Sequence, residues 1–491
     1  MKKMMLLMAA FGIAASVAAQ TLNVNQGNVT YAFPSSQMGD AVVTSNAILV
    51  GQKSFAVNAI SSIVVDDTEV SYNSVKVQYD GTAAHVTIAG NIAHLVTPVV
   101  NGAHVALLQD ASVAEEITYT LSGTSEDGSF YMAGNYKCTV ELKGVSLHNP
   151  DSAAINIEDG KRIAIALKKD TDNRLSDGLR GSDDGSNGHK ACLYVDGHPE
   201  FSGSGSLTVT GNVKHAISTD EYCQLKSSVG TITIVAAQSD GLHVGQYFQQ
   251  DGGTLVINAS GDGIDVSKKK DPSTENNGKV FLNAGSLTIT TDGKACKGIK
   301  SDDSVEINGA IIDITVKGDA VYDAETADAS SSAAIKGSLF TMTSGTVSLL
   351  ATGLGGKLIN SDGLVSISGG KITGAACGDI YVYSPTVDSK SHGIKSDADI
   401  VISGGEVYIA ASEDEAKAFK TDLMFAIKGG TVMGIGGKKS TPGADSTQGF
   451  KEYKDVVVRG GATVSYDGVS FTVPAEYENT GAKVMVSKAG M

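Results

Sequence analysis

Gly230-Thr-Ile-Thr-Ile, followed 23 residues later by Gly253-Thr-Leu-Val-Ile, is the stretch of sequence that decides the fold. Both segments open on a glycine and continue with alternating β-branched residues. The same pattern begins at Gly205, Gly230, Gly253, Gly285, Gly309, Gly345, Gly370, Gly405, Gly430 and Gly461. The shorter intervals between these glycines cluster at 23 to 25 residues, and the longer ones fit the same unit with an insertion.

A repeat of this length, built from short strands and turns without a helical period, is typical of one coil of a β-solenoid. The sequence therefore predicts an all-β, right-handed parallel β-helix. Strand residues alternate between the two faces, which predicts an interior ladder of Leu207, Ile232, Leu255, Leu287, Ile311 and Val347. The opening glycines fit tight corners that need a positive φ. A propeller would need longer antiparallel units, and a sandwich would not keep this spacing.

The ends of the chain lack the repeat. Lys2 and Lys3 precede an apolar run and the small residues Val17-Ala-Ala, which is typical of a secretory signal peptide. We therefore expect export to the extracellular space, the cell surface or the periplasm. The predicted division is residues 1–19 as signal peptide, 20–115 as N-terminal β cap, 116–475 as parallel β-helix and 476–491 as C-terminal cap or tail.

Composition narrows the choice of partner. The net charge of −16 argues against nucleic acid, and the absence of Trp argues against an aromatic sugar platform, so polar and ionic recognition is favoured. No mature stretch is apolar for long enough to predict membrane insertion.

Five scattered cysteines are interpreted as small buried hydrophobes, with Cys192 and Cys223 the pair nearest in sequence. The nine histidines show no metal-ligand spacing and are assigned structural or surface roles.

Aspartates recur near a second marker within each coil, a small residue followed by an apolar and a polar one. Stacked coils place equivalent positions roughly 4.8 Å apart, so carboxylates in a column repel unless cations lie between them. Ca²⁺ prefers such oxygen ligands and is the predicted cofactor. The alternative is that these are solvated turn aspartates. The candidate metal ligands in this group are Asp220, Asp240, Asp262, Asp265, Asp302 and Asp303.

The polar residue of the second marker defines another column, which becomes basic toward the C-terminus. It comprises Ser218, His243, Asp265, Lys300, Lys336, Lys395, Lys420 and Lys451. Lys300, Lys336, Lys395 and Lys420 are the candidate ligand-binding residues, because a polyuronate carries carboxylates at regular spacing. The alternative is a solvated wall in which Lys300–Asp302 and Lys395–Asp397 pairs offset the charge.

Four segments carry a resemblance to a known family. They are Asn173-Arg-Leu-Ser-Asp-Gly, the acidic loop at 182–188, Ala191-Cys-Leu-Tyr and the later Gly298-Ile-Lys-Ser-Asp-Asp. Together they resemble the bacterial carbohydrate-binding-domain β-helix family, over roughly residues 116–473. The resemblance implies a shape like calcium-dependent pectate lyases and binding of pectic polygalacturonate and cellulose. It also assigns a calcium role to Asp177 and to the coil-turn acids Asp220, Asp302 and Asp303. Gly241-Leu-His and Gly263-Ile-Asp depart from the usual Gly-Ile-Lys pattern.

These observations predict a secreted, non-catalytic protein that binds anionic (pectic) or cellulosic polysaccharide along its side wall, with calcium. No catalytic residue is assigned. One alternative is a calcium-dependent pectate-type lyase that uses Lys300 or Lys395 as general base. The other is a structural, adhesin-like surface protein that contacts cell-surface components.

Overall fold

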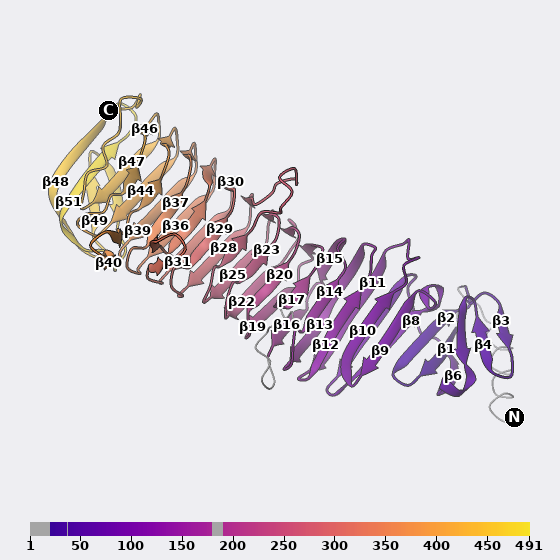
Figure 1. Ribbon diagram of the computed structural model, residues 1–491. Helices are drawn as coiled ribbons and strands as arrows, with labels where there is room; N and C mark the ends of the chain where they lie inside the picture. Colours follow the sequence, from indigo (N-terminus) through magenta and orange to yellow (C-terminus); the bar gives the residue numbers. More distant parts are fainter. Residues whose placement is uncertain (1–19, 37, 179–189) are drawn as a thin grey trace. The chain divides into compact units, whose positions relative to one another are not determined.

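The computed structural model describes residues 20–36, 38–178 and 190–491, and the chain divides into two compact units, Met1–Thr208 and Val209–Met491. Both are all-β (Figure 1). The predicted signal peptide at 1–19 and the acidic loop at 182–188 lie outside the described residues. Within the described part, no helix has the length and apolarity needed to cross a membrane.

The first unit begins with mostly antiparallel pairings and continues with parallel ones. Its early elements are β1 (Thr21–Gln26), β2 (Val29–Pro34), β3 (Ala41–Val43), β4 (Ala47–Val50), β5 (Lys53–Ala56), η1 (Val57–Ala59), β6 (Ser62–Asp66), β7 (Ser74–Asp80), β8 (Ala83–Ala89), η2 (Gly90–Ile92) and β9 (Val96–Asn101). One parallel series follows in β10 (Ala103–Gln109), β12 (Gly128–Ala133), β14 (Ile155–Glu158) and β17 (Ala191–Val195). The other strands are β11 (Ile117–Ser125), β13 (Cys138–Asn149), β15 (Arg162–Leu167), β16 (Asp172–Asp177), β18 (His198–Ser202) and β19 (Ser206–Gly211).

The second unit contains three series of parallel strands, and each coil of the chain adds one strand to each series. The first series is β22 (Thr231–Ala237), β25 (Thr254–Ala259), β28 (Ser286–Thr291), β31 (Ile311–Val316), β36 (Thr346–Ala351), β39 (Lys371–Ala376), β44 (Glu406–Ala411) and β47 (Thr431–Gly436). The second is β21 (Cys223–Leu225), β24 (Phe248–Gln250), β27 (Val280–Leu282), β30 (Ser304–Ile307), β35 (Leu339–Met342), β38 (Val365–Ile367), β43 (Ile400–Ile402) and β46 (Phe425–Ile427).

The third series carries the polar columns discussed below. It consists of β20 (His215–Thr219), β23 (Leu242–Val244), β26 (Ile264–Val266), β29 (Lys297–Ser301), β34 (Ala333–Gly337), β37 (Lys357–Ser361), β42 (Ile394–Ser396) and β45 (Phe419–Thr421). The Ile299–Ile335–Ile359–Ile394 ladder runs along its inner side, with each side chain at most 1% exposed. Apolar burial of this kind contributes roughly 1.5–3 kcal/mol for each side chain.

The prediction of the interior ladder is wrong at one position, Ile311. Ile311 is 61% exposed, whereas Ile312 is buried and pairs in register with Leu287 and Val347. Sequence reading aligned Gly309 with the corner glycines, but in the register Ala310 occupies that place, opposite Gly345. A one-residue slip turns every side chain of a strand to the other face.

Seven of the ten opening glycines have the predicted positive φ, whereas Gly205, Gly230 and Gly309 do not; the seven are Gly253, Gly285, Gly345, Gly370, Gly405, Gly430 and Gly461. Gly405 has φ +79° and Gly430 has φ +89°, and a Cβ on either would lie 2.7 Å from the carbonyl oxygen of the equivalent glycine one coil earlier. Glycine is needed there both for its positive φ and for the close approach of successive coils.

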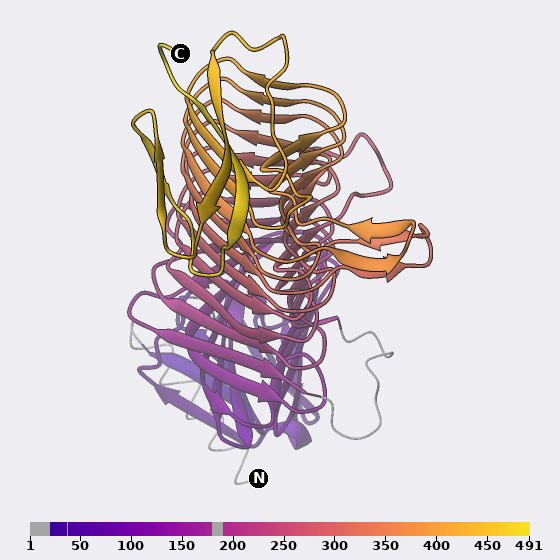
Figure 2. The ribbon, with the colours of Figure 1, turned by 90° about the vertical axis from the view of Figure 1, so that its left-hand side faces the viewer.

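Two of the predicted insertions form hairpins that project side by side from the second unit (Figure 2). They are β32 (Val321–Asp323) with β33 (Asp328–Ser330), and β40 (Tyr381–Ser384) with β41 (Val387–Ser389). Tyr322 and Tyr383 stack between them, with ring centroids 4.0 Å apart. The insertions therefore build a wall beside the third series.

The C-terminal strands are antiparallel. They are β48 (Phe450–Val458), β49 (Thr463–Tyr466), β50 (Val469–Thr472) and β51 (Asn479–Ser487). Gly461, which was assigned to the repeat, precedes the β49–β50 hairpin, and Lys451 lies on β48 rather than in the third series. Val464, Phe471 and Tyr477 pack with the end of the parallel series in one buried cluster. The five cysteines are all free thiols, including Cys192 and Cys223.

Candidate functional site

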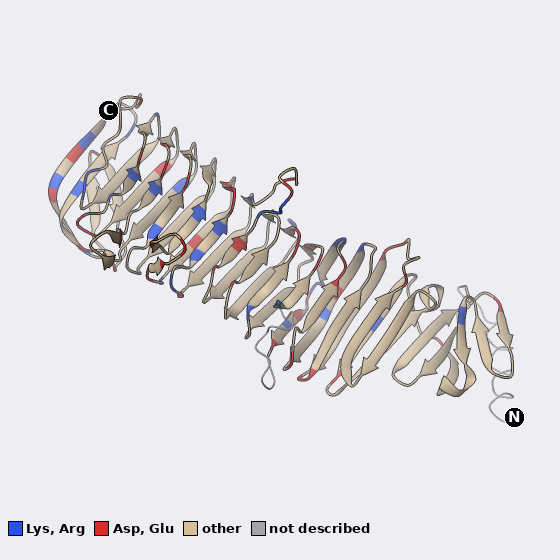
Figure 3. Cartoon of the chain, viewed as in Figure 1, with Lys and Arg blue, Asp and Glu red and all other residues tan. Residues whose placement is uncertain are grey.

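A row of lysines follows the third strand series. Lys300 pairs in register with Lys336, Lys336 with Asn360, Asn360 with Lys395 and Lys395 with Lys420. The four strand steps from Lys300 to Lys420 cover roughly 19 Å at about 4.8 Å each. Figure 3 shows basic residues recurring on successive strands of this unit. All four predicted ligand-binding lysines thus share one face.

A pocket of about 610 Å³ lies over the part of this row from Lys336 to Lys420. Lys300 does not line it, but lysines from outside the row do. One wall comes from strands β33 and β41 of the two hairpins. Eight lysines and three carboxylates line the pocket, in an otherwise acidic chain. The lysines are Lys297, Lys336, Lys357, Lys390, Lys395, Lys417, Lys420 and Lys438, and the acids are Asp328, Asp388 and Glu415. We call this feature the lysine pocket.

Lys357 is the most buried of these lysines, at 6% exposure. Its Nζ donates to Ser331 Oγ at 2.6 Å, to Ser389 Oγ at 2.7 Å and to the Gly355 carbonyl at 3.2 Å. Burial, followed by the neighbouring charge of Lys395, lowers the pKa of Lys357 from 10.5 to about 7. The hairpin serines thus hold a lysine that loses its proton near neutrality.

His392 lies at the edge of the same pocket and is also buried. Its Nδ1 accepts the Lys417 backbone N–H at 3.0 Å. Burial and the charge of Lys357 lower the pKa of His392 to about 3, so its imidazole is neutral at physiological pH. It adds a polar surface without adding charge.

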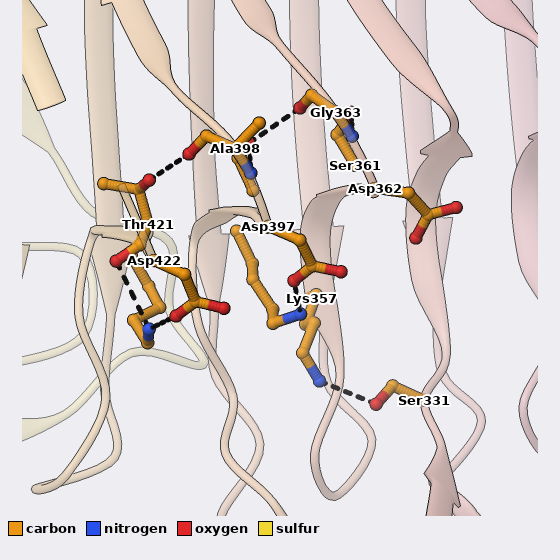
Figure 4. A network of polar contacts seen from close by, with 12 residues as sticks. Ser331, Lys357, Ser361, Asp362, Gly363, Asp397, Ala398, Thr421 and Asp422 are labelled. Carbon is orange, nitrogen blue, oxygen red and sulfur yellow. Dashed lines mark hydrogen bonds and ion pairs between the residues drawn. The ribbon is translucent and has the colours of Figure 1, made fainter. Parts of the chain in front are cut away.

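The outer lysines of the row are ion-paired, which is what the solvated-wall alternative expects. Lys336 pairs with Asp362, Lys395 with Asp397 and Lys420 with Asp422. Figure 4 shows these three aspartates in successive coils. Beside them, Thr421 Oγ1 donates a hydrogen bond to the Ala398 carbonyl of the preceding coil. Exposed pairs of this kind contribute little, and a polyanion can replace the aspartate partner.

Lys300 has a different partner from the one predicted. Its Nζ lies 3.0 Å from Asp265 Oδ1 and 4.0 Å from Asp262 Oδ2, rather than pairing with Asp302. Burial acts to lower the pKa of Lys300, but the two carboxylates outweigh it and raise that pKa. Lys300 is therefore held as an ammonium and is a poor general base.

Three of the predicted calcium ligands gather around two histidines. Asp240 Oδ2 lies 3.1 Å from His215 Nδ1 and 3.2 Å from His243 Nδ1, and Asp265 Oδ2 lies 3.2 Å from the latter nitrogen. Asp262 Oδ1 accepts the Lys297 backbone N–H at 2.6 Å. Burial raises the pKa of Asp262 to about 6. We call Asp240, Asp262, Asp265, His215 and His243 the His–Asp cluster.

The remaining predicted acids lie elsewhere and do not form one column with this cluster. Asp302 Oδ2 accepts the Lys268 backbone N–H at 3.0 Å, and Asp303 Oδ1 lies 3.1 Å from Lys268 Nζ. Asp220 follows β20, and Asp177 is fully buried at the end of β16 in the first unit. Calcium binding at these four residues stays a prediction.

The His–Asp cluster is a poor fit for calcium. Ca²⁺ takes six to eight oxygen ligands, whereas here two imidazole nitrogens and the Lys300 ammonium occupy the carboxylates. An oxygen cage cannot form without displacing these nitrogen groups. The donor set instead combines nitrogen and oxygen.

Comparison with known proteins identifies the family. Residues 109–380, more than half of the chain, match the family described as carbohydrate-binding domain-containing protein. The chain belongs to this family. A carbohydrate-binding domain-containing protein of Acetivibrio thermocellus is 30% identical over 218 residues, covering 38% of this chain and 74% of that protein. The solved polysaccharide lyase-like protein from C. thermocellum, a gadolinium derivative, is 26% identical and covers 50% of this chain and 91% of that chain, with a TM-score of 0.42.

Family membership supports a carbohydrate-binding role for this chain. The lysine pocket is only partly within the matched segment, because Lys390, Lys395, Lys417, Lys420 and Lys438 lie beyond residue 380.

Sequence reasoning missed two parts of this site. Lys357 and Asn360 were passed over because Lys357-Leu-Ile-Asn lacks the small residue of the second marker. The 59-residue gap between the markers at Ala334 and Gly393, more than two repeat units, was the available signal. His215 and His243 were dismissed because ligand spacing was sought along the sequence rather than across coils.

Proposed function

We propose that this protein is a non-catalytic binding protein for acidic polysaccharide of the polyuronate (pectic) class, which it holds in the lysine pocket and along the lysine row. The observation that carries this proposal is the set of eight lysines lining one depression in an acidic chain. A polyuronate presents carboxylates at intervals that can meet lysines on successive coils, and Lys–carboxylate contacts are charge-assisted hydrogen bonds.

We also propose that the strands form a right-handed parallel β-helix with caps at both ends, and that the protein acts outside the cytoplasm. The three parallel series of the second unit support the first statement, and the residue pattern of 1–19 supports the second. Calcium is retained as a proposed cofactor at Asp302 and Asp303, which are close to the surface. N-terminal sequencing of exported protein would test the cleavage after residue 19.

Binding is tested by calorimetric titration with polygalacturonate oligomers, with uncharged cello-oligosaccharides as the comparison ligand. We expect the Lys395→Met/Lys420→Met double variant to weaken binding of the uronate by roughly two- to thirtyfold, because each exposed charge contact is worth about 0.2–1 kcal/mol. The matched control is Lys371→Met, since Lys371 forms an exposed ion pair with Glu406 in the first strand series. Equal affinity of all three proteins would refute the proposed site, and preference for cello-oligosaccharides would refute the ligand class.

Calcium is tested in the same titration, run with added Ca²⁺ and with a calcium chelator. If the chelator abolishes binding, and the Asp302→Asn/Asp303→Asn double variant loses binding in the same way in the presence of Ca²⁺, a calcium site at those two residues is supported. Binding that is unchanged by chelator would remove calcium from the proposal and leave the lysine contacts standing.

A second candidate, polysaccharide lyase activity, is favoured by one specific observation. A lysine with pKa about 7 in a cationic pocket could take the proton beside a uronate carboxylate, which Lys300 cannot do as a held ammonium. The electron pair of the broken C–H bond forms the double bond of an unsaturated uronide, the bond to the departing sugar oxygen breaks, and that oxygen takes a proton from solvent. The base in this candidate is Lys357 rather than Lys300 or Lys395.

The two candidates differ in the sign of their pH dependence. A protonated Lys357 adds one positive charge to the pocket, so the affinity for a polyanion should fall as the pH rises through about 7. Lysis needs the neutral amine, so the rate should rise over the same range. Ultraviolet absorbance of the unsaturated product detects lysis, and its absence at every pH would exclude this candidate.

A further inference from the structure

We propose that the His–Asp cluster is a binding site for a transition-metal dication of the zinc class, with His215, Asp240 and His243 as ligands. Asp240 Oδ2 lies 3.1 Å from His215 Nδ1 and 3.2 Å from His243 Nδ1. The ligand atoms of His215, Asp240 and His243 all lie within 4.8 Å of one another. This site is distinct from the lysine pocket.

The spacing of these donors matches a metal site. With metal–nitrogen and metal–oxygen bonds of about 2.0–2.1 Å, adjacent ligand atoms at octahedral or tetrahedral angles lie roughly 3.0–3.4 Å apart. The two contacts of Asp240 Oδ2 with the histidine nitrogens are 3.1 and 3.2 Å. A single ion can therefore contact all three residues without a change of fold, with water as a further ligand.

His215 supplies the second argument. His215 Nδ1 lies 3.3 Å from the Asp240 backbone nitrogen and 3.1 Å from Asp240 Oδ2. A protonated Nδ1 donates to Oδ2 and an unprotonated Nδ1 accepts the backbone N–H, so this nitrogen serves one of the two neighbours at a time. A cation bound to the lone pair of Nδ1 would also contact Oδ2. The two imidazole rings stack with centroids 4.5 Å apart, which aligns both Nδ1 atoms on the same carboxylate.

The surroundings hold the ligands in place. Asp240 Oδ1 accepts the Asp262 backbone N–H at 2.9 Å, and Lys300 binds the other oxygen of Asp265, so each carboxylate turns its Oδ2 toward the histidines. Such outer contacts orient ligands in metal sites. His215, Asp240 and Asp265 are at least nine-tenths buried, whereas the His243 side chain is 36% exposed and gives solvent access.

The donor chemistry selects the class of ion. Two imidazoles and one carboxylate suit Zn²⁺ and its first-row neighbours, whereas Ca²⁺ and Mg²⁺ prefer oxygen alone. The carboxylates of Asp240, Asp262 and Asp265 lie beside Lys297, Lys300 and His243, so a dication would replace the proton that Asp240 and Asp265 hold on His243. The ligands come from the coils of β20 and β23, so a bound ion would tie two successive coils together.

The test uses the full-length exported protein without a polyhistidine tag, stripped of metal by a chelator. Titration with Co²⁺ is followed by its visible absorption, and Zn²⁺ and Ca²⁺ are then added as competitors. We expect one equivalent of Co²⁺ to acquire a spectrum typical of nitrogen ligands, Zn²⁺ to displace it, and excess Ca²⁺ to leave it unchanged.

Variants assign the site. His243→Gln should weaken Co²⁺ and Zn²⁺ binding by at least roughly tenfold, the lower end of the effect of losing even an outer contact. His148→Gln, which removes a partly buried histidine bonded to Ser176, should bind like the natural protein. An unchanged affinity in His243→Gln, no cobalt binding at all, or displacement of cobalt by Ca²⁺ would overturn the proposal. The competition arms use the natural protein, so they decide the question even if a variant misfolds.

Discussion

Replacing Lys357 by methionine should stabilise the protein near neutral pH and flatten its dependence on pH. The Lys357 ammonium is buried among hydroxyl and carbonyl groups, and its pKa is about 7 instead of 10.5. The unfolded chain binds this proton below about pH 10.5, whereas the folded chain binds it only below about pH 7. Folding therefore carries an electrostatic cost at neutral pH that methionine, with a similar shape and no charge, does not have.

The size of the effect follows from the gap between the two pKa values. A gap of 10.5 to about 7 corresponds to ~5 kcal/mol once the pH is at or below 7. The cost shrinks as the pH rises, because the unfolded state releases its proton only near pH 10.5, and about 2 kcal/mol of it disappears between roughly pH 7 and 9. Methionine loses the hydrogen bonds to Ser331 and Ser389, each worth about 1 kcal/mol net. The variant should thus gain about 2–3 kcal/mol at neutral pH and less at alkaline pH.

Urea denaturation of the natural protein and Lys357→Met at about pH 7 and 9 measures this effect. Far-ultraviolet circular dichroism is the appropriate signal, because the chain has no Trp. Lys371→Met is the matched control and should keep the natural pH dependence, since Lys371 is half exposed and paired with Glu406. If the natural protein and Lys357→Met show parallel pH dependence, Lys357 is not a depressed lysine, and the lyase candidate loses its base.

Three further results are expected. Gly405→Ala should destabilise the protein by about 1–3 kcal/mol in thermal or urea denaturation. Alanine is strained at φ +79°, and its Cβ would lie 2.7 Å from the Gly370 carbonyl oxygen. The control is Gly481→Ala, because Gly481 has open space around it and no positive φ. Ile312→Ala should cost about 2–5 kcal/mol, whereas Ile311→Ala should cost less than about 1, and the reverse order would contradict the register of β31. Polygalacturonate affinity should fall steeply with added salt, and salt-independent binding would show that the lysine contacts carry little of it.

The repeat was readable from the sequence because each coil contributes the same strands and corners. Alternation and glycine placement located most of the first strand series, but they could not fix the register of β31, where Ala310 stands in the glycine position. Only the pairing with Thr346 shows that Ile312 rather than Ile311 points inward. The projecting insertions were located from the long intervals, but the pairing of their strands and the Tyr322–Tyr383 contact depend on packing between coils.

The site was predictable to the extent that it repeats with the coil. Lys300, Lys336, Lys395 and Lys420 recur at one place in the marker, and the register brings them onto one face. The repeat period could not predict which side chains surround each position. His243 and Asp265 occupy the same column as Lys300, yet the column changes there from a cationic row to a buried network, because Asp240 and Asp262 enter from the turn before each strand. The same register position thus carries lysines in one part of the series and a buried His–Asp network in another, and the residue that precedes the strand determines which of them is built.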